Sequence, residues 1–289
     1  MNPRVSIVLP TYSRADLLPG AIDSILAQTY TDWELIIVDD CSKDETPQVV
    51  ADFMARDSRI RSIRNDPNKK LPASLNIGSD AARGAFITWT SDDNFMRPRM
   101  LERLVEELEN DPELGVVYSH CMLIDEDLKE LEIAPVSVYT DLLRWNCVRG
   151  CFMYRREVHE KLGGYDVNRF LVEDWDFWLR ASIHFKMKHL EEDLYLYRMH
   201  EGSLTATREN EILQKTAFLI EEYLAKVPYA KGKVKFESHL ALVHYCRRSK
   251  MFGKMFKHLS LALLSQPLTT ITHVGPRALK RMVGITKSA

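Results

Sequence analysis

Two adjacent carboxylates, Asp92 and Asp93, are the residues whose type and position first indicate chemistry. They follow residues 85–90, an apolar, β-branched and aromatic run that predicts a buried strand. Carboxylates at the end of a buried strand are costly unless a positive charge lies beside them. A divalent cation held by one or two carboxylates, with phosphate oxygens completing its shell, meets that need. The alternative is a solvated turn in which an aspartate caps the following helix.

Two further acidic pairs lie at the ends of predicted elements. Asp39 and Asp40 end the apolar run 33–38, and Glu173 and Asp174 begin a predicted helix. Carboxylates in the first turn of a helix are favoured by the helix dipole, so the residues alone favour a capping role for the second group. His200 follows an alternating run that predicts a strand at 193–199, and a lone histidine is more often a structural hydrogen-bond partner than a ligand.

The elements that carry these residues alternate in type. Short apolar runs at 5–9, 33–38, 60–63 and 85–90 predict strands separated by helices, which indicates a parallel sheet covered by helices. The carboxyl ends of parallel strands meet at one edge, where open α/β sheets bind ligands. Both aspartate pairs are expected there, which favours phosphate chemistry. Ser13 with Asp16, and Ser42 with Glu45, predict capping boxes for the first two helices.

The last third of the chain differs from the rest. Residues 209–225, 234–248 and 250–264 predict helices, and the last of them is amphipathic and basic. Residues 231–289 contain twelve Lys and Arg and one acidic residue, Glu237, whereas residues 1–230 contain 27 basic and 40 acidic residues. A basic tail on an acidic body is expected to meet something anionic, such as a lipid surface. The alternative is a helical subdomain that packs on the core or on a second subunit.

Composition places the chain among globular proteins, with 45% hydrophobic and 28% charged residues in 289. Its five cysteines are irregularly spaced, which disfavours a zinc site and predicts a reducing, cytoplasmic environment. The N-terminal apolar run is too short for a signal peptide, and no run of about 18 apolar residues predicts a membrane span.

Several short motifs occur together in one order. They are VSIVLPTYSR (5–14), SILAQTYTDWELIIVDDCS (24–42), LNIG (75–78), ARGAFI (82–87), SDD (91–93), GGYD (163–166), EDWD (173–176) and YRMH (197–200). The combination resembles the inverting family 2 glycosyltransferases of the GT-A fold, in which a glycine often stands at the position of Cys41. The segment TSDDNFMRP (90–98) is most similar to the bacterial polysaccharide and spore-coat type.

The resemblance implies an α/β fold with a Rossmann-like, nucleotide-binding mixed sheet flanked by helices. Residues 1–205 would form the GT-A domain, with a nucleotide-binding half at 1–95 and an acceptor-binding half at 96–205. Residues 206–289 would form a basic, helical C-terminal extension. The implied site residues are Asp93 and His200 for a divalent metal, Mn²⁺ or Mg²⁺; Pro10, Thr11, Tyr12, Arg14, Asp40 and Asp92 for the nucleotide, with Asp40 on uracil; and Asp174 as general base, with Glu173 and Asp176 as runners-up.

The implied activity is metal-dependent transfer of a hexose from a UDP- or dTDP-linked donor to a hydroxyl of a saccharide or lipid-linked acceptor, in polysaccharide or cell-surface glycan biosynthesis. We also expect a cytoplasmic location, with peripheral contact on the inner face of the membrane or a homo-oligomer formed through the basic helices. A nucleotidyltransferase is disfavoured because the loop after the first strand contains no glycine, and the same loop lacks the G-x-G-x-x-G of a dehydrogenase. A non-catalytic carbohydrate-binding or scaffold protein stays an alternative, and no feature supports a nucleic-acid partner.

Overall fold

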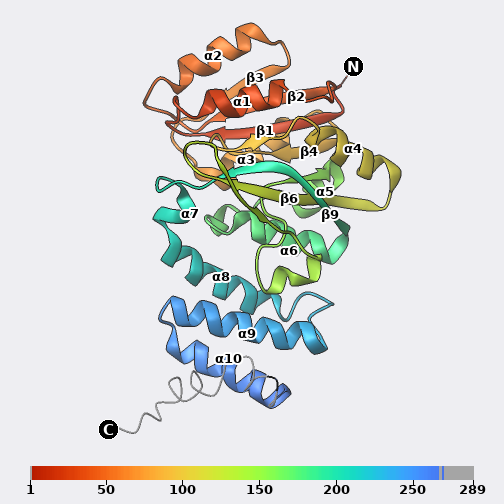
Figure 1. Ribbon diagram of the computed structural model, residues 1–289, viewed down its shortest axis with the longest axis vertical. Coiled ribbons are helices and arrows are strands. Elements are labelled where there is room, and N and C mark those ends of the chain that lie inside the picture. Colours follow the sequence, from red (N-terminus) through yellow and green to blue (C-terminus); the bar gives the residue numbers. More distant parts are fainter. Residues whose placement is uncertain (1, 267–268, 270–289) are drawn as a thin grey trace. The chain divides into compact units, whose positions relative to one another are not determined.

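Strands and helices alternate through the first half of the protein, as its sequence predicts. In the computed structural model, which describes residues 2–266 and 269, β1 pairs in parallel with β2 and β4, and β2 pairs in parallel with β3 (Figure 1). The carboxyl ends of these strands therefore meet at one edge of the sheet. The bounds of the elements are β1 (Val5–Thr11), α1 (Leu18–Leu26), β2 (Trp33–Asp39), α2 (Thr46–Arg56), β3 (Ile60–Arg64), α3 (Lys70–Ala81) and β4 (Phe86–Trp89).

The remaining strands turn this sheet into a mixed one. The strand order is β3-β2-β1-β4-β8-β6-β9-β5, and β7 pairs with β6 outside that path. β8 is antiparallel to both β4 and β6, whereas β6 and β9 are parallel. The bounds here are β5 (Phe95–Met96), α4 (Met100–Asn110), β6 (Leu114–Ile124), β7 (Glu130–Ala134), β8 (Phe152–Arg155), α5 (Arg156–Leu162), α6 (Glu173–His184), β9 (Lys186–Arg198) and α7 (Leu204–Thr207).

Helices cover both faces of the sheet because the central strands are apolar on both. Leu9 and Ile37 belong to the core cluster that includes residues of α1, α2 and α4. Their neighbours Val8 and Val38 point to the other face, where α3 packs closely. A Cβ atom at Gly78 of α3 would lie 2.3 Å from Val8 Cγ1, so a larger residue there would displace the helix. This packing fixes the strand ends that carry the acidic pairs.

The predicted capping boxes are wrong. Neither α1 nor α2 receives a side-chain cap from Ser13 or Ser42. The two serines connect the loops after β1 and β2 instead: the Ser13 amide donates to Ser42 Oγ at 2.9 Å, and the Lys43 amide donates to Ser13 Oγ at 3.1 Å. The capping-box pattern considers only partners three residues away, whereas the hydrogen-bond partners of Ser13 and Ser42 lie about thirty residues away in the sequence. These bonds hold two edge loops together.

The protein divides into two compact units. The first contains residues 1–142 and 146–207, and the second contains 143–145 and 208–289. The second unit is built from α8 (Glu209–Tyr223), α9 (Gly232–Arg248) and α10 (Phe252–Ser265), which agrees with the three helices predicted there. Its short segment 143–145 is anchored to α9, because Tyr245 Oη donates to the Arg144 carbonyl at 2.9 Å and Arg144 pairs with Glu237 at 3.3 Å.

The basic character of the second unit is partly neutralised. Lys254 and Lys257 of α10 both pair with Glu221 of α8. The predicted basic extension continues beyond α10, and its basic residues from Arg277 onward lie outside the described residues. Across residues 2–266 and 269, we find no helix that is long and apolar enough to cross a membrane.

Candidate active site at the carboxyl edge of the sheet

Asp92 is the most deeply buried carboxylate of the predicted metal motif, with 9% of its surface exposed. Thr11, at the end of β1, donates its hydroxyl to Asp92 Oδ2 at 2.7 Å. Burial raises the pKa of Asp92 to about 6, and the neighbouring charge of Asp93 adds to the rise, against the bonds from Thr11 and the Tyr12 amide and the charge of Arg14. A positive ligand would therefore be stabilised here.

Asp93 lies against His200, which comes from the loop after β9. The distance from His200 Nε2 to Asp93 Oδ2 is 3.1 Å, and both side chains are largely buried. The same loop is held to the loop after β1, because Arg14 Nη2 donates to the Gly202 carbonyl at 3.0 Å. The ends of β1, β4 and β9 thus bring Thr11, Arg14, Asp92, Asp93 and His200 together, although they span residues 11–200 of the chain.

The donor set of this cluster fits a divalent metal that also binds a diphosphate. Asp93 and His200 offer one carboxylate oxygen and one imidazole nitrogen, and they lie beside Asp92, whose pKa is raised. In the part of the chain that the structure describes, no group of three or more His, Cys, Asp or Glu side chains is arranged to hold a metal alone. Mg²⁺ sites in phosphate chemistry use one or two carboxylates and take other ligands from water and the substrate.

Asp40 is buried and anchors the loop between β3 and α3. Its carboxylate accepts three hydrogen bonds of 2.8 Å, from Asn65 Nδ2 and from the amides of Lys69 and Lys70. A carboxylate offers about four lone-pair sites, so one remains for a further donor. Asp39, in contrast, accepts from Arg64 and from the Ser42 amide, which is a structural role.

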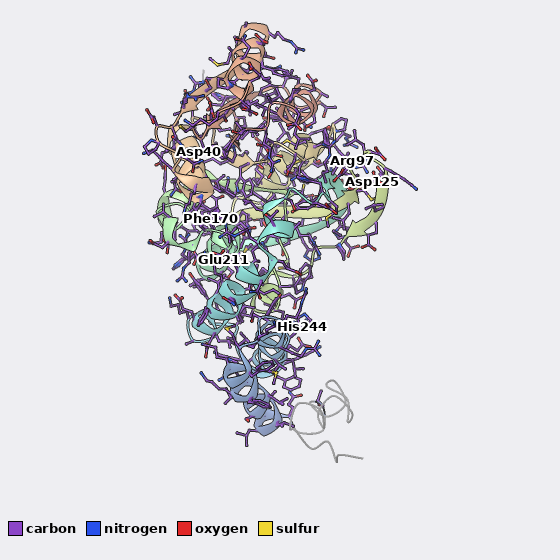
Figure 2. All side chains as sticks on the ribbon, turned by 90° about the vertical axis from the view of Figure 1, so that its left-hand side faces the viewer. Asp40, Arg97, Asp125, Phe170, Glu211 and His244 are labelled. Atoms are coloured by element: carbon purple, nitrogen blue, oxygen red, sulfur yellow. The ribbon has the colours of Figure 1, made fainter. Side chains whose placement is uncertain are left out.

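The remaining residues of the predicted nucleotide loop lie at the carboxyl end of β1. Pro10 is buried in β1, where its Cα lies opposite that of Val38, and Tyr12 is half exposed just beyond the strand. Figure 2 shows Asp40 and Phe170 on one side of the first unit, with Arg97 and Asp125 on the other. Lys70 connects the first two: its amide bonds Asp40, and its ammonium lies 5.4 Å from the centre of the Phe170 ring.

Asp174 lies in the first turn of α6. Its Oδ2 accepts from Asn146 Nδ2 at 2.7 Å and its Oδ1 from the Trp175 amide at 2.7 Å. Burial raises the pKa of Asp174, and these two bonds oppose the rise. The pKa of Tyr197 in β9 is raised by burial and further by the charges of Asp93 and Asp174.

The two runners-up have different surroundings. Asp176 is buried and pairs with Arg180 at 2.7 Å, which accounts for it as a structural ion pair. Glu173 is buried at the start of α6. Sequence reasoning missed the contact of Asn146 with Asp174. Nothing in the pattern around residue 146 marks an asparagine that contacts α6.

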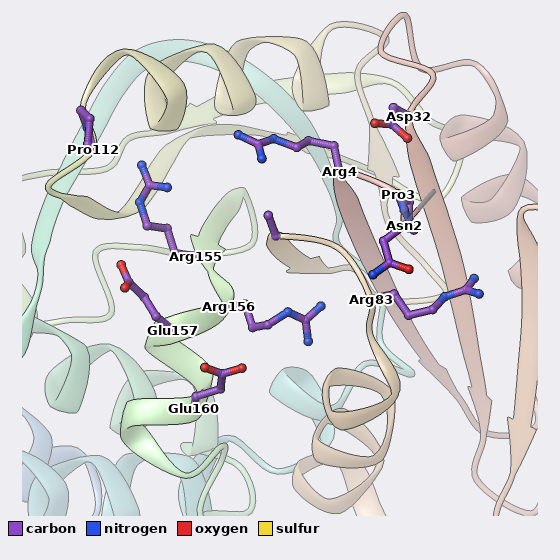
Figure 3. Close-up of a pocket in the computed structure, with 11 residues that line it drawn as sticks. Asn2, Pro3, Arg4, Asp32, Arg83, Pro112, Arg155, Arg156, Glu157 and Glu160 are labelled. Atoms are coloured by element: carbon purple, nitrogen blue, oxygen red, sulfur yellow. The ribbon is translucent and has the colours of Figure 1, made fainter.

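A cavity of about 720 Å³ lies at the opposite, amino-terminal edge of the sheet (Figure 3). Four arginines line it together with Asp32, Glu157 and Glu160. Two of the arginines are already paired, Arg4 with Glu109 and Arg83 with Glu34. Arg155 and Arg156 donate to backbone carbonyl groups. The acidic partners balance the arginines, so charge does not favour an anion there, and no predicted site residue lines it.

Comparison with known proteins identifies relatives along most of the chain. Residues 6–163 match the family described as Glycosyl transferase family 2. The chain is 32% identical over 265 residues to the uncharacterized glycosyltransferase EpsJ of Bacillus subtilis (strain 168), covering 86% of this chain and 73% of the relative. It is 34% identical over 224 residues to the putative glycosyltransferase EpsE of the same organism, covering 73% and 81%.

Solved structures with the same fold have lower identity. The mannosyltransferase PcManGT of Pyrobaculum calidifontis, in complex with GDP-Man and Mn²⁺, superposes with a TM-score of 0.67 at 19% identity, covering 99% of this chain and 82% of that one. S. aureus TarS 1–349 in complex with UDP-GlcNAc gives 0.64 at 15%, covering 98% and 92%. The predicted GT-A fold, a mixed sheet flanked by helices, is confirmed.

Proposed function

The chain belongs to glycosyl transferase family 2, and on that premise we propose that it transfers a hexose from a nucleotide sugar to a hydroxyl group, with inversion at the anomeric carbon. The observation that carries the proposal is the cluster at the carboxyl edge, where His200 Nε2 lies 3.1 Å from Asp93 Oδ2 and Thr11 donates to the neighbouring Asp92. Asp93 belongs to a cluster suited to a metal and a diphosphate, and Asp174 is a partly buried carboxylate suited to accept a proton. An inverting transfer needs these two functions on one site.

The donor side of the proposal rests on the carboxyl-edge cluster. Asp93 and His200 would hold Mn²⁺ or Mg²⁺, which supplies positive charge for the leaving diphosphate. Arg14 would contact a phosphate, and Pro10, Thr11 and Tyr12 would enclose the ribose and base. Asp92 would lie near the ribose or sugar. The relatives bound to GDP-Man with Mn²⁺ and to UDP-GlcNAc support a nucleotide-sugar donor.

The base of the donor would be read by Asp40. Its one remaining acceptor site suits a single N–H donor, such as N3–H of uracil or thymine. We therefore infer a UDP- or dTDP-linked donor. A guanine presents two neighbouring donors on its pairing edge, and the occupied oxygens of Asp40 leave room for only one of them.

The acceptor side rests on Asp174. Its carboxylate accepts the proton of the acceptor hydroxyl while that oxygen forms a bond to the anomeric carbon. The bond between this carbon and the diphosphate oxygen breaks on the opposite side, through an oxocarbenium-like state, and the configuration inverts. The acceptor would be a saccharide or lipid-linked hydroxyl in cell-surface polysaccharide assembly, reached from the cytoplasm.

Calorimetric titration tests the donor site. UDP, dTDP and GDP would be titrated with Mn²⁺ and with EDTA into the wild type, Asp93→Ala, and the exposed control Asp127→Ala. We expect metal-dependent binding of a pyrimidine diphosphate that Asp93→Ala weakens at least tenfold, or about 1.4 kcal/mol, and that Asp127→Ala leaves unchanged. If no nucleotide binds the wild type under any condition, the catalytic proposal fails and the scaffold alternative leads.

A further inference from the structure

Asn146 precedes β8 and reaches the side chain of Asp174. Its Nδ2 donates to Asp174 Oδ2 at 2.7 Å. An ionised carboxylate can only accept hydrogen bonds, so the amide nitrogen must face it and the amide oxygen must face away. Asn146 Oδ1 is buried, and within the described residues no group donates to it.

The amide oxygen of Asn146 therefore gains no hydrogen bond from the described residues. A buried acceptor without a donor is destabilising, and such a group in a native protein requires an explanation. The bond to Asp174 offers one. Asn146 donates a side-chain hydrogen bond to Asp174 Oδ2. The other oxygen, Oδ1, accepts a hydrogen bond from the Trp175 amide in the backbone of α6.

The other titratable groups near Asp174 lie on α6 and on neighbouring segments. Burial raises the pKa of both Tyr165 and Tyr197, and the charge of Asp174 adds to the rise. Glu173 and Asp176 lie on the same helix and are acidic. The guanidinium of Arg169 lies 3.7 Å from Asp176 in the first turn of that helix. Burial raises the pKa of Asp174, and the Trp175 amide and Asn146 oppose that rise.

We propose that Asn146 is a positioning residue, which holds Asp174 in one orientation and in its ionised form, ready to accept the proton of the acceptor hydroxyl. The inference rests on the proposed role of Asp174 as general base. Each oxygen of Asp174 receives one hydrogen bond, from Asn146 or from the α6 backbone, and keeps a lone pair for the incoming hydroxyl. The segment before β8 then belongs to the catalytic machinery.

The test measures the ionisation of Asp174 directly. Protein with ¹³C-labelled aspartate would be titrated by NMR as wild type, Asn146→Ala and Asn146→Asp, and the Asp174 resonance would be assigned by its loss in Asp174→Asn. We expect the titration midpoint to rise by about one pH unit in Asn146→Ala and further in the isosteric Asn146→Asp, which adds a second negative charge. Asn168→Ala is the matched control, because it removes an Asn–Asp bond of 3.0 Å outside the site.

The outcomes separate this inference from the proposed function. An unmoved midpoint in both Asn146 variants would overturn the positioning role, whatever their activity. A raised midpoint with an unchanged melting temperature supports it, since a merely structural residue would lower the melting temperature without moving the midpoint. Release of nucleoside diphosphate from nucleotide sugars is measured separately: if the wild type releases none, the proposed function fails, and the titration still decides the role of Asn146.

Discussion

At the scale of single residues, the charge of Asp92 opposes folding. Its pKa is about 6 in the folded protein and 3.8 without the fold. The native state therefore keeps a proton that the unfolded chain releases, and the penalty develops between about pH 4 and pH 6 and is complete above that range. Its size above pH 6 is about 3 kcal/mol.

Asp92→Asn should remove this penalty. The asparagine oxygen still accepts the Thr11 hydroxyl, so the local packing is retained. We expect the free energy of unfolding to rise by up to about 3 kcal/mol at neutral pH and to change little near pH 4, as measured by urea denaturation at both values. Equal stabilisation at both pH values would show that the charge of Asp92 is not its cause. The proposed function requires the same variant to lose nucleotide-sugar transfer.

The residue scale also shows what the sequence can reveal of a site. Asp92 and Asp93 could be proposed as site residues from the sequence because they directly follow an apolar run that predicts a buried strand. The capping boxes failed because Ser13 and Ser42 have better partners in each other's loops than in their own helices. The role of Asn146 could not be predicted from the sequence, because its contact with Asp174 joins two segments that only the tertiary fold brings together.

At the scale of helices and strands, α9 and α10 meet through two buried histidines. The Nδ1 atoms of His239 and His258 lie 3.1 Å apart, which requires one of them to carry the proton and the other to accept it. Burial lowers the pKa of His239 to about 4, and repulsion from His258, Lys235 and Lys257 adds to this. Burial also lowers the pKa of His258, against the attraction of Glu221.

The histidine pair predicts an acid-labile helical unit. Below about pH 6.5 the unfolded chain takes up protons that the folded pair cannot, so stability falls as the pH drops from about 6.5 towards 4. We expect a lower melting temperature at pH 5 than at pH 7.5 by differential scanning calorimetry, and His239→Gln should reduce that difference. His184→Gln, on the exposed end of α6, is the control; a reduction as large as that of His239→Gln would exclude the pair as the cause.

The same scale explains which elements could be predicted. The strands β1, β2 and β4 were recognisable because they are largely apolar on both faces, as buried parallel strands require. The edge strand β3 is short and contains both apolar and polar residues. Two other strand segments lack such an apolar run. In β7 and in the first half of β9, from Lys186, charged or exposed residues interrupt the apolar ones. Their place in the sheet is set by pairing with β6, a partner distant in sequence that periodicity cannot identify.

At the scale of the whole molecule, α10 presents an apolar stripe to solvent. Phe252 and Phe256 lie one turn apart and are 53% and 42% exposed, and Leu264 is 82% exposed. The chain around them is strongly basic, with twelve Lys and Arg after residue 230 against one acidic residue. An apolar stripe within a basic segment suits a surface of anionic lipid.

Vesicle sedimentation tests this surface. We expect the full chain to bind phosphatidylcholine vesicles that contain phosphatidylglycerol and not those that lack it. Phe252→Ser with Phe256→Ser should weaken binding at least tenfold, since each buried phenylalanine contributes about 1.5–3 kcal/mol. Phe218→Ser removes an exposed phenylalanine of α8 and serves as control. If the double variant instead dissociates a dimer in sedimentation velocity and vesicles bind none of the proteins, the stripe is a subunit interface.

The anchoring of Arg144 to α9 has a consequence for control of the enzyme. Arg144 is bonded to Tyr245 and Glu237 within the helical unit, and only two peptide bonds separate it from Asn146, which holds the proposed base. Residues 144–146 thus connect a unit without predicted catalytic side chains to the proposed base Asp174. A lipid or second subunit that displaced α9 would act on turnover remotely, and by thermodynamic linkage an occupied site would change the affinity of α9 for that partner.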